Sequence, residues 1–170
     1  MNPFSDSDDD ETDPHEKGAI FTNASNIRQR LMNAFVAFER DILAVGKMAR
    51  EDRWTVNQCR AWYYENSYYT GSGWVVETSG PLARLRNVSA FVTKATKKKK
   101  CKSAFTKEEI GILEDFGKKL KKFYTGVMGS HDFRNAIAKS HVEKSGEVAI
   151  EIVENTETYE KIVGLQSNNS

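Results

Sequence analysis

Hydrophobic residues recur at steps of three and four over most of the chain, a pattern typical of helices with one buried face. The first such segment runs from about Asn26 to Arg50, and Asn23 or Ser25 can cap its first turn. Its apolar positions are Ile27, Leu31, Ala34, Phe35, Phe38, Ile42 and Val45. The spacing predicts a long helix whose apolar face enters a core.

Two further helices follow from start signals and the same period. Thr55 and Gln58 have the spacing of a capping box, which predicts a second helix ending near Asn66. Pro81 suits the first position of a third helix. The apolar face of that helix consists of Leu82, Leu85, Val88, Phe91, Val92 and Ala95.

A fourth helix has the clearest beginning. Thr106 and Glu109 form a second capping box, and the predicted helix ends at Gly126 or Gly129. Its apolar side is formed by Ile110, Leu113, Phe116, Leu120, Phe123 and Val127. A short helix within residues 131–141 would be the fifth.

Two segments read instead as β structure. Aromatic and β-branched residues around Gly71-Ser72-Gly73 predict a small hairpin over about residues 68–77. Alternating Glu and β-branched residues over 147–154, and a second run at 159–163, predict a C-terminal β segment.

These elements indicate a mainly α (α+β) fold: four to five helices, a hairpin near 68–77 and a C-terminal β segment near 147–163. Residues 1–18 read as a disordered acidic tail, because they are rich in Asp, Glu, Ser and Pro. Residues 19–165 are expected to form a single globular domain. Residues 166–170 are expected to be frayed.

Charge changes this picture, because the net charge of +1 conceals a strong segregation. Residues 1–16 carry seven acidic side chains and no Lys or Arg, whereas residues 81–107 carry nine Lys or Arg and no acid. Such a segment fits a solvated loop, a nuclear-import signal or a polyanion-binding site. The polyanion-binding candidates are Arg84, Arg86, Lys94, Lys97, Lys98, Lys99, Lys100 and Lys102.

Aromatic residues are concentrated immediately before the basic segment. Seven of the 21 residues from Trp54 to Trp74 are aromatic, including all three tryptophans. They either form part of the core or stack on unpaired bases beside the lysines. The candidates for base stacking are Trp62, Tyr64, Tyr68 and Trp74.

The remaining motifs argue against catalysis and metal binding. Cys59 and Cys101 lie 42 positions apart and form no ligand spacing with the three histidines, so we expect no metal and no cofactor. No phosphate-binding glycine loop or catalytic constellation is evident. The chain has neither a signal-peptide pattern nor a run of about 18 apolar residues. We therefore expect a cytoplasmic or nuclear protein, neither secreted nor transmembrane.

Three hypotheses of function remain open. The first is a non-enzymatic protein that binds nucleic acid, such as RNA, or another polyanion without sequence specificity; a nuclear-import carrier would be an additional partner. The second is a small structural protein, similar to a viral matrix or coat subunit, that forms a homo-oligomer and contacts RNA or an anionic membrane surface. The third is an adaptor recognised through its acidic tail, which contains Asn2-Pro3-Phe4.

Overall fold

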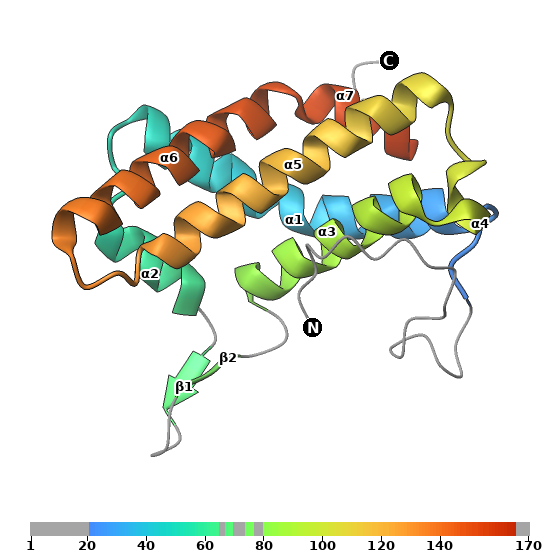
Figure 1. The fold of residues 1–170 in the computed structure, drawn as a ribbon. Coiled ribbons are helices and arrows are strands. Elements are labelled where there is room, and N and C mark those ends of the chain that lie inside the picture. The colour runs from blue at the N-terminus through green and yellow to red at the C-terminus, as the bar shows by residue number, and fades with distance from the viewer. Residues whose placement is uncertain (1–20, 65–66, 70–73, 77–79, 166–170) are drawn as a thin grey trace.

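The computed structural model describes residues 21–64, 67–69, 74–76 and 80–165. Its body is a bundle of four long helices (Figure 1). These are α1 (Ile27–Arg50), α3 (Pro81–Lys97), α5 (Lys107–Gly129) and α6 (Asn135–Glu154). The shorter elements are α2 (Val56–Tyr64), β1 (Ser67–Tyr69), β2 (Trp74–Val76), α4 (Lys99–Lys102) and α7 (Thr156–Val163).

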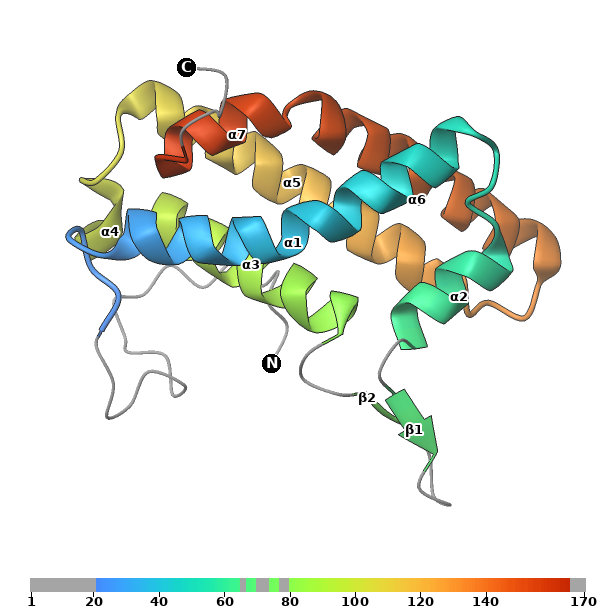
Figure 2. The ribbon, with the colours of Figure 1, turned by 180° about the vertical axis from the view of Figure 1, so that it is seen from behind.

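Each long helix packs antiparallel against two neighbours. α1 and α5 lie diagonally across the bundle, and both contact α3 on one side and α6 on the other (Figures 1 and 2). This is the up-down-up-down arrangement of a four-helix bundle. α2 lies at one end of the bundle, whereas α4 and α7 lie at the other (Figure 2). The two ends therefore differ in the elements that cover them.

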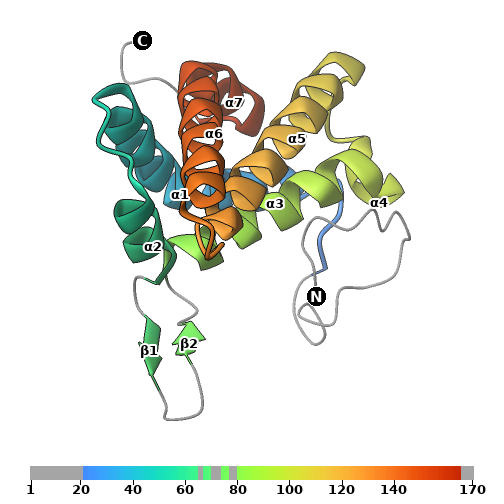
Figure 3. The ribbon, with the colours of Figure 1, turned by 60° about the vertical axis from the view of Figure 1, so that its left-hand side comes forward.

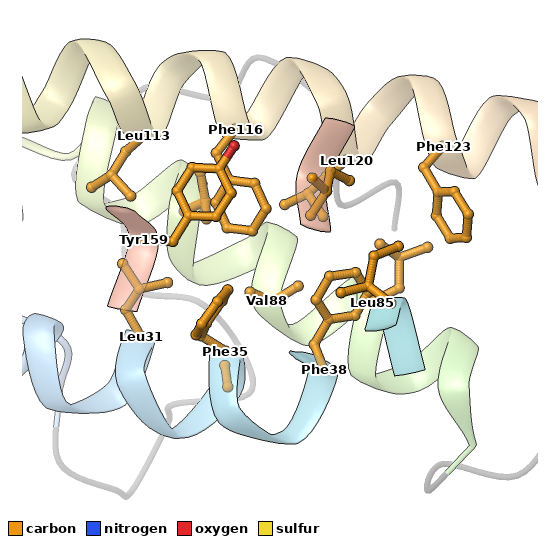
Figure 4. Close-up of a cluster of buried hydrophobic side chains, with 14 of the residues drawn as sticks. Leu31, Phe35, Phe38, Leu85, Val88, Leu113, Phe116, Leu120, Phe123 and Tyr159 are labelled. Atoms are coloured by element: carbon orange, nitrogen blue, oxygen red, sulfur yellow. The ribbon is translucent and has the colours of Figure 1, made fainter. Parts of the chain in front are cut away.

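Aromatic rings from three helices meet in the core. Phe116 of α5 stacks on Tyr159 of α7 with ring centroids 4.0 Å apart, and Phe35 of α1 approaches both rings edge-on (Figure 4). All three side chains are buried. Such geometry adds to the stabilisation from burial alone, so this contact fixes α7 against α1 and α5.

The predicted starts of α5, α2 and α3 are confirmed, whereas the predicted cap of α1 is wrong, because its N-cap is Asn26 and no side chain caps it. At α5, Thr106 Oγ1 accepts a hydrogen bond from the Glu109 amide (3.1 Å), and Glu109 Oε1 accepts one from the Thr106 amide (2.9 Å). This is the predicted capping box. At α2, Thr55 Oγ1 accepts from the Gln58 amide at 3.2 Å. Pro81 is the first residue of α3.

The predicted α+β fold is wrong, because the C-terminal segment is helical. Residues 147–154 are the second half of α6, and residues 159–163 belong to α7. The buried positions of α6 recur at helical steps over a window longer than the predicted strand: Ala138, Val142, Ser145, Gly146, Val148, Ala149 and Ile152. Because several of these residues are small, the helical period is weak in hydrophobicity even though it determines burial.

The predicted hairpin also contributes little to the fold. The structure describes only two three-residue strands, in which Tyr68 pairs with Val75 in an antiparallel register. The pair projects away from the helices (Figure 3). The predicted turn at 71–73 and the expected tails at 1–18 and 166–170 lie outside the described residues. The architecture is thus mainly α, without a β layer among the described residues.

Two glycines allow long helices to approach closely. A Cβ atom placed on Gly126 of α5 would lie 2.8 Å from the carbonyl oxygen of His141 in α6. A Cβ on Gly46 of α1 would lie 2.8 Å from Val153 Cγ2, also in α6. Gly126 therefore does not end α5 but marks its contact with α6.

Candidate polyanion-binding face

The helices of the bundle separate charge by side. Residues 81–130, which include α3, α4 and α5, carry 13 Lys or Arg and four acids. Residues 135–163, which include α6 and α7, carry three Lys and six Glu. α3 and α4 lie on the side of the bundle away from α6 and α7 (Figure 3). The structure thus converts a charge pattern along the chain into a basic side and an acidic side.

Two of the predicted binding residues have roles within the bundle. Arg84 forms a two-point ion pair with Asp41 of α1, with its Nε 2.6 Å and its Nη2 3.0 Å from the carboxylate oxygens. Lys94 is buried, and its Nζ lies 5.4 Å from the centre of the Phe91 ring. Arg84 is engaged by α1 and Lys94 is buried beside a ring of its own helix, so neither is presented as an open cation.

The other predicted cations lie near the surface. Arg86 on α3 and Lys99 and Lys102 on α4 are exposed, whereas the remaining members, Lys97, Lys98 and Lys100, are partly buried. The chain changes direction at Lys98, whose backbone is extended between α3 and α4. This bend interrupts the helical spacing of the consecutive lysines at the α4 end of the bundle.

α5 adds lysines that the sequence analysis did not include. Lys118, Lys121 and Lys122 are exposed, while Lys119 forms an ion pair with Asp115. Their signal in the sequence was the run Lys118-Lys119-Leu120-Lys121-Lys122, in which Leu120 alone belongs to the apolar face. In a helix this spacing directs most of the lysines away from the buried side.

The two sets of cations lie on neighbouring helices. A Cβ at Gly117 would lie 3.3 Å from Val92 Cγ1, so these residues mark the same level of α5 and α3. Because the helices are antiparallel, Arg86 and Lys121 lie toward the α2 end from this level, and Lys97 lies toward the α4 end. We call the surface formed by Arg86, Lys97, Lys99, Lys102, Lys107, Lys118 and Lys121 the lysine face.

The structure does not bring the described aromatic candidate to this face. The Trp62 ring packs edge-on against Trp54 (6.5 Å) and Phe123 (5.5 Å). α2, which carries Trp62, lies at the bundle end opposite to α4 (Figure 1). The side chains of the other three candidates, Tyr64, Tyr68 and Trp74, lie outside the described residues.

A hollow of about 750 Å³ lies near the α2 end, between the end of α1, the start of α2 and α6. Val56, Val142 and Ile150 contribute apolar surface, whereas Arg60 and Glu143 contribute charge. Its wall combines charges of both signs with apolar surface.

Near this end, the Cys59 thiol is buried and His131 is partly buried. Burial raises the pKa of the Cys59 thiol to about 11. Burial and the charge of Arg60 lower the pKa of His131, whose ring contacts Tyr63 with centroids 4.7 Å apart. Cys59 and Cys101 are both free, buried thiols. A thiol with a pKa as high as that of Cys59 is a poor nucleophile.

Within the described residues, no group of three or more His, Cys, Asp or Glu is arranged to hold a metal ion. The helices described also include none that is long and apolar enough to cross a membrane. No protein-family model matches the chain, and comparison with curated proteins and with solved structures finds no significant match. The lysine face is therefore judged on its own geometry and charge.

Proposed function

We propose that this protein is a non-enzymatic binding protein that engages the phosphate backbone of nucleic acid through the lysine face. The observation that carries the proposal is the alignment of cations on α3, α4 and α5, three consecutive elements on one side of the bundle; all of them except the partly buried Lys97 are exposed. Of the four acids in residues 81–130, two are engaged by other side chains, and Glu108 and Glu114 are exposed. Glu109 caps α5 and pairs with Arg28, and Asp115 pairs with Lys119.

The dimensions of the face suit a nucleic-acid strand. Arg86 and Lys97 are eleven residues apart on α3, which corresponds to about 16 Å along a helix. One strand of B-DNA presents a phosphate every ~3.4 Å along the axis, so this length spans about five phosphates. Lys118 and Lys121 form a second row on α5. Two parallel rows can follow one backbone without reading its bases.

The residue types favour contact with the backbone over recognition of sequence. All members of the lysine face except Arg86 are lysines. A lysine ammonium acts as a point charge, whereas two-point reading of guanine is typical of arginine. We therefore expect strong salt dependence and little sequence preference.

Nucleic acid is favoured over an anionic membrane by the shortage of apolar side chains beside these lysines. Membrane-surface helices combine cations with large apolar residues that enter the lipid. Among the exposed large apolar residues of the described chain, Phe21 is the one placed next to a lysine of the basic segment. One such residue provides little insertion.

The test is a salt titration of binding to duplex DNA, single-stranded RNA and anionic vesicles. In one variant, Lys99, Lys102, Lys118 and Lys121 become Gln. Four lost phosphate contacts should reduce the slope of log K against log salt for duplex DNA by about 3 to 4. In the control, which removes three positive charges instead of four, the lysines of the acidic side become Gln: Lys139, Lys144 and Lys161.

The control should bind as the unmodified chain does. If both variants lose affinity equally, only net charge matters and the lysine face has no special role. If vesicles bind and neither nucleic acid does, lipid is the ligand. If neither nucleic acid nor vesicles bind, the proposal is wrong.

A second candidate function, self-assembly, has its own observation. Val36 and Leu43 are 47% and 43% exposed and lie two turns apart on the outer side of α1. Exposed residues at this spacing fit a helix–helix interface between copies of the chain. Light scattering tests this: a dimer that dissociates in Val36→Glu/Leu43→Glu would support it. A monomer at all concentrations would reject it.

A further inference from the structure

The chain enters the bundle at a fixed point just before α1. Asn26 Nδ2 donates a hydrogen bond to the carbonyl oxygen of Phe21 (2.7 Å), and Asn26 Oδ1 accepts one from the Asn23 amide (2.9 Å). Arg30 Nη1 donates to Thr22 Oγ1 (2.6 Å), and Thr22 is buried. Residues 21–26 are thus held by side chains of α1 and of its N-cap.

This entry point lies against α4. The Cys101 Sγ lies 3.7 Å from the carbonyl oxygen of Thr22, to which the thiol donates. Lys100 Nζ lies 6.0 Å from the centre of the Phe21 ring. Two consecutive residues of α4 therefore contact the two residues at which the N-terminal segment joins the bundle. The N-terminal segment therefore joins the bundle next to the basic cluster at residues 97–102.

The sequence that precedes this point is strongly acidic. The seven acids within residues 6–16 are Asp6, Asp8, Asp9, Asp10, Glu11, Asp13 and Glu16. Glu16 is five residues from Phe21 and Asp6 is fifteen, so their tethers extend to at most about 17 Å and about 50 Å. Both tethers are longer than the distance from Phe21 to Lys100. A short tether also gives an attached ligand an effective concentration in the millimolar range.

We infer that residues 6–16 are an intramolecular ligand of the basic cluster at 97–102, which they shield from external polyanions. Seven carboxylates tethered beside a run of lysines satisfy charge complementarity in both sign and position. Lys121 lies fourteen residues beyond Lys107, about 21 Å along α5, so the α5 lysines are shielded less than the α4 end. The competition part of this inference rests on the proposed function; the contact does not.

The contact can be tested without any nucleic acid. A carbodiimide joins carboxylates to amines that touch, and mass spectrometry locates the linked residues. We expect links from residues 6–16 to lysines 97–102, and fewer to the exposed Lys139 and Lys144 on the acidic side. Mixing isotope-labelled and unlabelled chains distinguishes links within one chain from links between chains. Equal yields at both sets of lysines, or no links at low salt, would overturn the inference.

The competition is tested by neutralising the tail. Changing its Asp to Asn and its Glu to Gln should tighten duplex DNA binding by roughly fivefold or more at low salt. The gain should disappear when Lys97–Lys100 and Lys102 are also Gln, because the shielded site is then gone. It should persist when Lys118, Lys121 and Lys122 are Gln instead.

The outcomes separate the two ideas. Equal DNA affinity with and without the tail charges contradicts shielding even where the chain binds DNA well. If no form binds DNA or RNA, the proposed function fails, and the cross-links alone decide whether the tail occupies the cluster.

Discussion

The contact between α5 and α6 at Gly126 provides a sharp test of the packing. A Cβ placed there would lie 2.7 Å from Ser145 Cβ and 2.8 Å from the carbonyl oxygen of His141. Neither atom can move easily. The His141 oxygen belongs to the α6 backbone, and Ser145 Oγ donates to Val142 O (2.7 Å) while accepting from Trp54 Nε1 (2.9 Å). Gly126→Ala must therefore push the two helices apart.

The magnitude follows from two opposing effects. Replacing Gly by Ala inside a helix stabilises it by about 1 kcal/mol. Overpacking a close contact destabilises by about 1 to 3 kcal/mol, and contact with backbone favours the upper end of that range. We expect Gly126→Ala to reduce the free energy of unfolding by about 2 kcal/mol.

Gly111 is the matched control on the same helix. A Cβ there meets nothing within 4 Å, so Gly111→Ala should stabilise by about 1 kcal/mol. The two midpoint temperatures should then differ by about 6 to 12 °C for a chain of this size. Thermal denaturation followed by circular dichroism measures both variants. If Gly126→Ala is as stable as Gly111→Ala, the close approach of α5 and α6 is wrong.

Three further predictions concern side chains at other places in the bundle. Arg84→Gln should reduce stability by about 1 to 3 kcal/mol in urea denaturation, because Asp41 is left without its partner, and should leave the DNA salt slope unchanged; a reduced slope would place Arg84 in the lysine face. Burial, followed by the hydrogen bond and charge of Glu160, raises the pKa of Glu39 from 4.5 to about 7. The folded chain binds this proton more tightly than the unfolded chain does. The contribution of Glu39 to the free energy of unfolding is therefore complete below pH ~4.5 and is lost as pH rises through ~7. The urea midpoint should therefore fall between pH 5.5 and 8, and a fall that is just as large in Glu39→Gln would assign it to other groups. Cys59 should react with a disulfide reagent only in denaturant, because its thiol is buried and its pKa is about 11; rapid labelling of the native chain would show that the site opens.

The long helices were predictable because their ends and faces have strong local signals. The capping box at Thr106 and the proline at 81 predicted the first residues of α5 and α3 to within one position. The apolar face from Ile27 to Val45 is buried as its period predicts. At these positions local preference and tertiary packing agree.

The C-terminal helices were not predictable from the same signals. Val148, Ile150 and Ile152 alternate with polar or small residues from position 147 to 152, which fits a strand as well as a helix. Whether this segment forms a helix depends on residues that are distant in sequence. Gly126 of α5 lets the α6 backbone approach closely, and Gly46 of α1 leaves room for a side chain of α6. A choice that depends on such partners is invisible in a short window.

The basic cluster was predictable as a run of charge, but the direction of its side chains was not. Arg84 faces α1 because it lies on the side of α3 that includes Val88 and Phe91, and its partner Asp41 is 43 residues away. Lys118 and Lys121 join the lysine face because α5 packs beside α3. Both facts depend on which helices are neighbours, and the sequence analysis did not establish this.

Arg28 makes folding depend on the far end of the chain. Its guanidinium donates to the carbonyl oxygens of Ile162 in α7 and of Ala104 (2.6 Å), and it lies 4.6 Å from the centre of the Phe105 ring. Ile162 is 134 residues further along, which takes about 7 to 27 s to synthesise at cellular translation rates. During that time, α1 is outside the ribosome while the surfaces that cover its apolar face are still being made. The contacts between α1 and α7 can form only after translation has passed α7, so until then the apolar face of α1 lacks part of its final cover.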